Sequence, residues 1–201
     1  MDKLTEKSPY DDLLKAWLEV NEYGERAGNS SKLQRIFRKN KVNDVFMRVN
    51  TPSKYRALYL FSRAKPTKQG GIYFPFLIVD GSEGDSFVAM EDDGTNTKQF
   101  ITVIHSHAVN RFIERHGWDG TKEKCEDYIL RGMWVSSRNI DQYTNEVVVY
   151  FDGGVFLGHL KDDVCHLNTY VANQRLFPNQ RLQSKRLQDN IEKLFKEFKQ
   201  D

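Results

Sequence analysis

The chain has 201 residues, of which 39% are hydrophobic and 29% are charged, and its formal net charge is +2 at pH 7. This composition is typical of a globular chain and excludes an intrinsically disordered one. The small net charge excludes a basic field over the whole molecule, so an anionic partner must bind a local patch, and nothing indicates DNA. Cys125 and Cys165 lack the spacing of a zinc site or a disulfide framework, and we expect two reduced thiols.

Targeting signals are absent from the sequence pattern. The N-terminus has no basic region followed by an apolar run, and no apolar run approaches the roughly 20 residues that cross a bilayer. We therefore expect a cytoplasmic protein that does not enter a membrane. No motif requires a cofactor, and we expect none.

Two helices are predicted near the N-terminus. Pro9 suits a first helical position, and an apolar stripe at helical spacing predicts a helix over residues 8–24. A second, short helix should follow Ser30 and Ser31. It carries the most basic run of the chain, namely Lys32, Arg35, Arg38, Lys39 and Lys41. We interpret this run as a solvated helix face, with contact to RNA or to a protein as the alternative.

Strands are predicted from residue 55 onward, over 55–61, 71–79 and 86–90, because these runs are rich in aromatic and branched residues. Pro75 predicts an edge strand or a bulge in the second of them. The turn-forming residues 50–54 favour a boundary between an N-terminal helical segment, 1–53, and an α+β domain, 54–201.

The second half combines three helices with four strands. A strand over 100–104 leads directly into a helix that starts near Ser106, and Thr121 can begin another helix that Gly132 ends. Strands over 146–151, 155–160 and 164–171 form an antiparallel meander, and an amphipathic helix is predicted over 179–200. The prediction is an α+β fold, an antiparallel meander packed against helices with N- and C-terminal helical additions.

One helix face combines a base with anion-binding groups. His107, Arg111 and Arg115 are four residues apart and therefore lie on one face. A neutral imidazole beside guanidinium groups can remove a proton while the arginines hold a phosphate, which is what metal-independent RNA cleavage needs. The alternative is that the arginines pair with Glu114 or with carboxylates of the sheet.

The last strand also carries polar groups at alternate positions. Strict alternation places Cys165, Leu167, Thr169 and Val171 on one face, and His166, Asn168 and Tyr170 on the other. Three polar or amphipathic side chains on one face indicate a wet or functional surface, or simply an exposed sheet face. His159, on the neighbouring strand, is expected near His166.

The pattern of these residues resembles a known group of domains. His107-Ala108, Arg111 and Arg115 open a helix before Gly117, and a meander follows whose last strand contains Thr169 and Tyr170. Over residues 99–172 this resembles small bacterial domains of unknown function that are similar to the barnase–colicin–RelE class of ribonuclease folds. The chain departs from their pattern by His116, inserted before Gly117, and by the order Asn-Thr-Tyr-Val in the last strand.

The resemblance implies a metal-independent ribonuclease or a toxin-like protein of a bacterium or mobile element. Its partners would be RNA and a protein such as an antitoxin. His107 would be the general acid or base, Arg111 and Arg115 would hold the phosphate, and Thr169 and Tyr170 would complete the catalytic group. The expected substrate-binding residues are His166, Asn168 and His159.

Two other functions fit the same residues. One is a non-catalytic module that binds RNA or protein through Arg111 and Arg115. The other is a metal site, because His105 and His107 together with His159 or His166 could supply three imidazoles to a divalent ion.

Overall fold

The computed structural model describes residues 3–40, 44–62, 72–92, 99–134, 136–151 and 153–178, together with residues 185 and 189. The helices of this part of the chain are α1 (Tyr10–Gly28), α2 (Ser31–Asn40), α3 (Ser106–His116) and α4 (Lys122–Trp134). Its strands are β1 (Asp44–Asn50), β2 (Arg56–Ser62), β3 (Ile72–Gly81), β4 (Gly84–Asp92), β5 (Gln99–Ile104), β6 (Ser137–Ile140), β7 (Glu146–Phe151), β8 (Gly154–Lys161) and β9 (Val164–Ala172). The predicted α+β class is confirmed, whereas the helix predicted over 179–200 lies outside the described residues except at positions 185 and 189.

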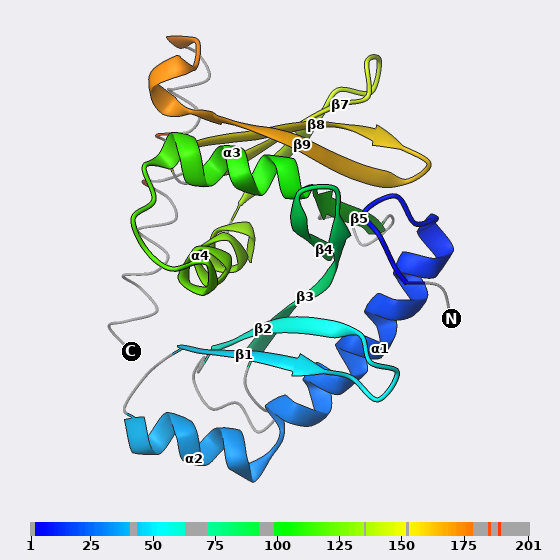
Figure 1. Ribbon diagram of the computed structural model, residues 1–201, viewed down its shortest axis with the longest axis vertical. Coiled ribbons are helices and arrows are strands. Elements are labelled where there is room, and N and C mark those ends of the chain that lie inside the picture. The colour runs from blue at the N-terminus through cyan, green and yellow to red at the C-terminus, as the bar shows by residue number, and fades with distance from the viewer. Residues whose placement is uncertain are drawn as a thin grey trace.

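A single sheet of these strands forms the centre of the molecule (Figure 1), in the order β1-β2-β3-β4-β5-β9-β8-β7-β6. All neighbours are antiparallel except β5 and β9, which are parallel. The meander β7-β8-β9 is confirmed, and β1 and β6 were not predicted. The proposed boundary at residue 53 stays a prediction, although β1 on its N-terminal side pairs with β2 on the other.

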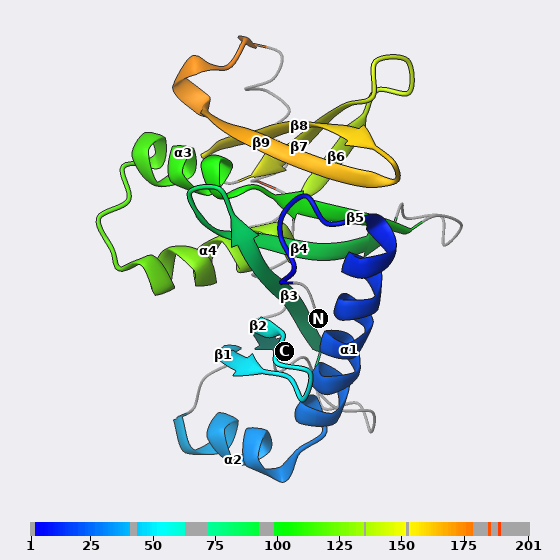
Figure 2. The ribbon, with the colours of Figure 1, turned by 45° about the vertical axis from the view of Figure 1, so that its right-hand side comes forward.

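The sheet curls strongly at its C-terminal end. In a flat sheet β6 would lie about 19 Å from β5, because four strand spacings separate them. Instead, the Nη2 of Arg138 on β6 donates a hydrogen bond of 2.8 Å to Thr102 Oγ1 on β5, and its Nη1 lies 3.7 Å from Cys165 Sγ on β9. Strands β6 to β9 therefore form a curved layer over β5 (Figure 2).

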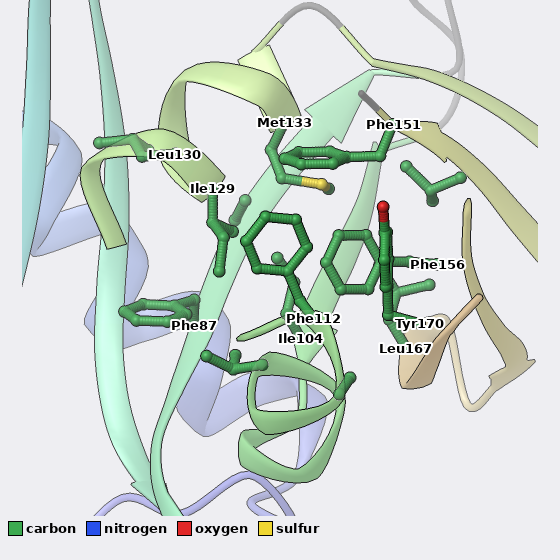
Figure 3. Packing of buried hydrophobic residues seen from close by; sticks show 14 of the residues in the cluster. Phe87, Ile104, Phe112, Ile129, Leu130, Met133, Phe151, Phe156, Leu167 and Tyr170 are labelled. Atoms are coloured by element: carbon green, nitrogen blue, oxygen red, sulfur yellow. The ribbon is translucent and has the colours of Figure 1, made fainter. Parts of the chain in front are cut away.

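Each face of the sheet buries its own apolar core. Ala57, Tyr59 and Phe61 of β2 face α1 and α2, whereas Leu58 and Leu60 face α3 and α4. Because β2 is covered on both sides, its sequence is a continuous apolar run and does not alternate. The core on the α3–α4 side gathers Phe112 of α3, Ile129 of α4 and Phe156 of β8 (Figure 3).

A bulge in β9 changes which residues face that core. Leu157 pairs with Thr169 and Gly158 pairs with Leu167, so Asn168 is an extra residue in β9. Beyond the bulge the alternation is shifted by one position. Tyr170 is fully buried against Phe112, with ring centroids 5.0 Å apart (Figure 3). The prediction that Tyr170 shares a face with His166 was therefore wrong.

Two local predictions differ from the structure. Helix α4 does not stop at Gly132, because a Cβ there would lie 2.1 Å from Cε2 of Phe151, and the glycine serves this close packing. Pro75 pairs with Tyr59 of β2, but the ladder of β3 with β4 covers only Leu77–Gly81 among the described residues. The strand is therefore not the predicted edge strand, since β3 lies between β2 and β4, and no bulge is present at Pro75 in the described ladder. The proline is tolerated because it lies where β3 has a described neighbour on one side only.

Candidate functional site

A groove of about 390 Å³ opens where the chain preceding α1 meets the outer face of β8 and β9. Its lining residues are Lys7, Ser8, Pro9, Tyr10, His105, His159, Lys161, Asp162, Val164, His166 and Asn168. The structure thus brings together His159, His166 and Asn168, the three predicted substrate-binding residues.

A hydrogen-bonded chain leads from a buried carboxylate to this groove. Oε2 of Glu6 lies 3.1 Å from Nδ1 of His105, and Nε2 of His105 lies 2.9 Å from Nδ1 of His166. His105 is the last residue before α3, in extended conformation, and its backbone N–H donates to the Leu167 carbonyl of β9. Backbone pairing and ring contact therefore both hold His105 beside His166.

The carboxylate of Glu6 is only 4% exposed and is enclosed by donors. The Ser86 hydroxyl donates to its Oε2 at 2.6 Å, and the Ser82 N–H donates to its Oε1 at 3.2 Å. Ser106, the first residue of α3, adds longer contacts to Oε2 from its N–H and its hydroxyl. Burial alone raises the pKa of Glu6, but the hydrogen bonds and the nearby His105 outweigh it and lower the pKa to about 2.

The ionised carboxylate fixes the tautomers of both histidines. Glu6 can only accept, so a neutral His105 must donate from Nδ1 and leave a lone pair on Nε2. His166 must then donate from Nδ1 to that lone pair. The lone pair of His166 therefore lies on Nε2, which makes this atom the basic end of the hydrogen-bonded chain.

His166 remains neutral at ordinary pH. Burial lowers its pKa, and the neighbouring imidazoles of His105 and His159 lower it further, to about 4. His105 also has a lowered pKa because of burial, although the Glu6 carboxylate opposes this effect. Because both imidazoles are neutral, the donor–acceptor order that Glu6 sets at His105 also fixes which nitrogen of His166 faces the groove as an acceptor.

His159 presents the opposite group to the same groove. Its ring stacks on that of His166, with centroids 5.5 Å apart. The amide Nδ2 of Asn168 lies 3.0 Å from Nδ1 of His159. An amide nitrogen only donates, so His159 accepts at Nδ1 and carries its hydrogen on Nε2. The groove thus combines a base on His166 with a donor on His159.

Charged side chains border the two imidazoles. Lys7 and Lys161 are exposed and line the groove, together with the single carboxylate of Asp162. Two ammonium groups against one carboxylate favour an anionic ligand. Tyr10, at the start of α1, adds a partly exposed aromatic ring to the wall.

The predicted row on α3 lies on one helix face, and each of its members has a protein partner. Nδ1 of His107 lies 3.2 Å from Oε2 of Glu83, and Arg111 forms an ion pair of 2.8 Å with Glu114. The Nε of Arg111 also lies 3.5 Å from Nε2 of His107. The ion pair of Arg111 with Glu114 is one that the alternative expected, and the catalytic roles of these residues stay predictions.

The remaining predicted residues are placed differently. Arg115 donates to the backbone carbonyl of Tyr170, so α3 and β9 do meet, but through main chain and not through the phenol. Thr169 is partly exposed, and alternation places it on the face of β9 opposite Tyr170. His107 does not line the groove that contains His166.

The same neighbourhood was considered as a metal site. His105, His159 and His166 do lie together, but the lone pair of His105 Nε2 is directed at His166. In the described part of the chain, no group of three or more His, Cys, Asp or Glu side chains is arranged to hold a metal ion. His107 lies with Glu83, apart from the other three.

Sequence reasoning missed Glu6, the residue that sets the tautomers. No local pattern marks it, since it lies about 100 positions from Ser106 in sequence and reaches the site only through the fold. A parallel bridge between Thr5 and Asp80 and the hydrogen bond from Glu6 N–H to the Asp80 carbonyl hold this segment against β3.

Among the described residues, no helix is long and apolar enough to cross a membrane. Models of known families, curated proteins and solved structures were compared with the chain, and none of them matches it.

Proposed function

We propose that the chain is a metal-independent ribonuclease whose catalytic residues are His159 and His166. The observation that supports this most directly is the hydrogen-bonded chain Glu6–His105–His166, which leaves a neutral base on Nε2 of His166 beside the donor Nε2–H of His159. A base and an acid at one groove are the two groups that transesterification of RNA requires.

In this reaction the His166 Nε2 takes the proton of a ribose 2′-hydroxyl, and the 2′-oxygen attacks the adjacent phosphorus. The bond from phosphorus to the 5′-oxygen breaks, and a doubly protonated His159 gives its Nε2 proton to that oxygen. The products are a 2′,3′-cyclic phosphate and a 5′-hydroxyl. Rotation of the Asn168 amide would present its oxygen to Nδ1–H of His159 and stabilise the protonated ring.

The other groups of the site act through charge. Glu6 and His105 are positioning residues, because they stabilise the imidazolium that forms on His166 without touching the substrate. Lys7 and Lys161 would neutralise the phosphate and its developing negative charge. RNA is the substrate class that supplies both an anionic phosphodiester and an internal nucleophile.

Labelled RNA incubated in EDTA with wild type, His166→Ala and His107→Ala tests the assignment. We expect cleavage by wild type and by His107→Ala, and at least a 100-fold slower reaction for His166→Ala, since general acid–base catalysis contributes about 10²–10⁴-fold. Melting temperatures of the three proteins show whether each variant is folded.

The opposite order of activities for the two variants would assign the catalytic site to α3. Loss of cleavage in His107→Ala with full activity in His166→Ala would make His107 the base, as the resemblance implies. Binding of RNA without turnover by all three proteins would favour the non-catalytic module.

A further inference from the structure

We propose that the exposed face of α2 is a second RNA-binding site, which contacts the phosphate backbone at a distance from the groove. The inference rests on the proposed function for its choice of RNA among polyanions. It extends that function because it predicts a substrate longer than the groove itself can hold.

The fold presents four basic side chains on one side of α2. Leu33 and Phe37 are 2% and 1% exposed and anchor the helix to the core under α1. At about 100° per residue, the four cations occupy an arc of roughly 120° centred opposite these two anchors. They are Lys32, Arg35, Arg38 and Lys39, and all four are exposed.

Among the described residues, no neighbour neutralises their charges. The sequence of α2, SKLQRIFRKN, contains no acidic residue. Within the described part of the chain none of the four forms an ion pair, whereas Arg48, Arg56 and Arg131 each pair with a carboxylate. The α2 cations are therefore available to an external anion, and four of them lie along a helix about 15 Å long.

The chemistry of this face favours RNA over a membrane surface. A helix that binds a bilayer inserts an apolar face beside its basic one. The large apolar residues Leu33 and Phe37 are instead buried in the protein, and Ile36 is half-buried, so α2 has no broad apolar face to insert into a bilayer and offers mainly charge and hydrogen bonds. Phosphate recognition by Lys and Arg needs nothing more.

The exposed face of α2 lies at a distance from the groove (Figure 1). Helix α1 runs between them, since Tyr10 at its start lines the groove and α2 follows its end. Nineteen helical residues span about 28 Å, so a dinucleotide in the groove cannot reach α2, whereas a longer RNA can.

The test compares full-length wild type with two variants of equal net charge. The first replaces the α2 face: K32Q/R35Q/R38Q/K39Q. The control replaces four exposed basic residues elsewhere: K15Q/K54Q/K124Q/R175Q. The probe is a fluorescent single-stranded 2′-O-methyl RNA, which a 2′-hydroxyl mechanism cannot cleave, titrated at several salt concentrations. Thermal melting verifies that both variants are folded.

For wild type and the control we expect the four phosphate contacts of α2, at about 0.7 each, to contribute about −2.8 to the log–log salt slope, which alone raises Kd about 50-fold between 50 and 200 mM salt. The α2 variant should lose most of this slope and affinity. Equal binding by all three proteins, or equal loss in the control, would overturn the inference. A parallel measurement uses phosphatidylserine vesicles as the probe. If the α2 variant lost vesicle binding but bound RNA like wild type, the inference would also be overturned.

Cleavage of a dinucleotide in the same preparations separates this inference from the proposed function. We expect the α2 variant to cleave the dinucleotide like wild type and to show a raised KM only for long RNA. If wild type binds RNA through α2 but cleaves nothing, the ribonuclease proposal fails and the docking site stands. If the dinucleotide is cut and α2 has no effect on long RNA, the docking site fails alone.

Discussion

Glu6 shows how a single buried residue can define the chemistry of a site made by others. Its carboxylate accepts from two serine hydroxyls and two backbone N–H groups, and its contact with Nδ1 of His105 dictates the hydrogen on each following ring. A change at Glu6 should therefore alter both stability and the protonation of His105 and His166.

Glu6→Gln should destabilise the protein at pH 7 by about 2 kcal/mol, after allowance for solvent screening of the pKa shift. Because the folded pKa of Glu6 is lowered from 4.5 to about 2, its stabilisation is fully present above pH 4.5 and is lost as the pH falls toward 2. Urea unfolding between pH 7 and pH 2 measures this. The difference between wild type and Glu6→Gln should shrink in that window, and a constant difference would contradict the account.

At the scale of residues, the part of the site formed by strands that are consecutive in sequence could be predicted. The cluster of His166 and Asn168 near His159 follows from one hairpin, which the meander pattern specifies. Glu6 and His105 could not be paired in the same way, because their contact depends on how the N-terminal segment docks on β3.

At the scale of elements, the bulge in β9 decides what the last strand offers to each face. It directs Tyr170 into the core and leaves His166 and Asn168 on the groove side. Periodicity alone could not reveal it, because one extra residue inverts every later position.

Gly158, opposite the bulge, should not tolerate a side chain. A Cβ there would lie 1.8 Å from the His166 carbonyl oxygen, which is backbone and cannot rotate away. Gly158→Ala should cost about 1–3 kcal/mol of stability and lower the cleavage rate, because His166 must shift. Chemical unfolding and the RNA assay measure the two effects.

Gly120→Ala is the matched control, since the nearest atoms to a Cβ there belong to the movable Trp118 side chain, at 3.0 Å. It should change stability by less than about 0.5 kcal/mol. Equal costs at Gly120 and Gly158 would refute the proposed role of the bulge.

Other elements differ in how far the sequence predicted them. Helix α1 was predicted from its apolar stripe, although it continues to Gly28, past the predicted end at residue 24, and strand β5 was predicted from its short apolar run. Strand β6 has only four residues, SRNI, and its Arg138 is held by Thr102 and Cys165, so tertiary contacts and not local preference make it a strand. Strand β1 contains Arg48, which pairs with Glu126 and Asp127 of α4.

At the scale of the whole molecule, one sheet joins two cores. The parallel pair β5–β9 lies where the N-terminal and C-terminal strands meet, and β2 contributes side chains to both sides. The order of these strands could not be predicted, because it depends on pairings between segments distant in sequence.

The continuous sheet predicts a single unfolding transition. Phe37→Ala, in the core under α1, and Phe112→Ala, in the core under α3, should each lower stability by about 3–5 kcal/mol and shift the same calorimetric peak. Two peaks, each moved by one variant, would instead support separate units divided near residue 53.

The central claim is that this chain cleaves RNA through a ribose 2′-hydroxyl without a metal ion. The most direct measurement uses a DNA oligonucleotide with one ribonucleotide, incubated with wild type in EDTA and analysed by mass spectrometry. The account predicts one cut, immediately 3′ of the ribonucleotide, leaving a 2′,3′-cyclic phosphate and a 5′-hydroxyl. An intact oligonucleotide, or cuts at deoxyribonucleotides, would contradict it.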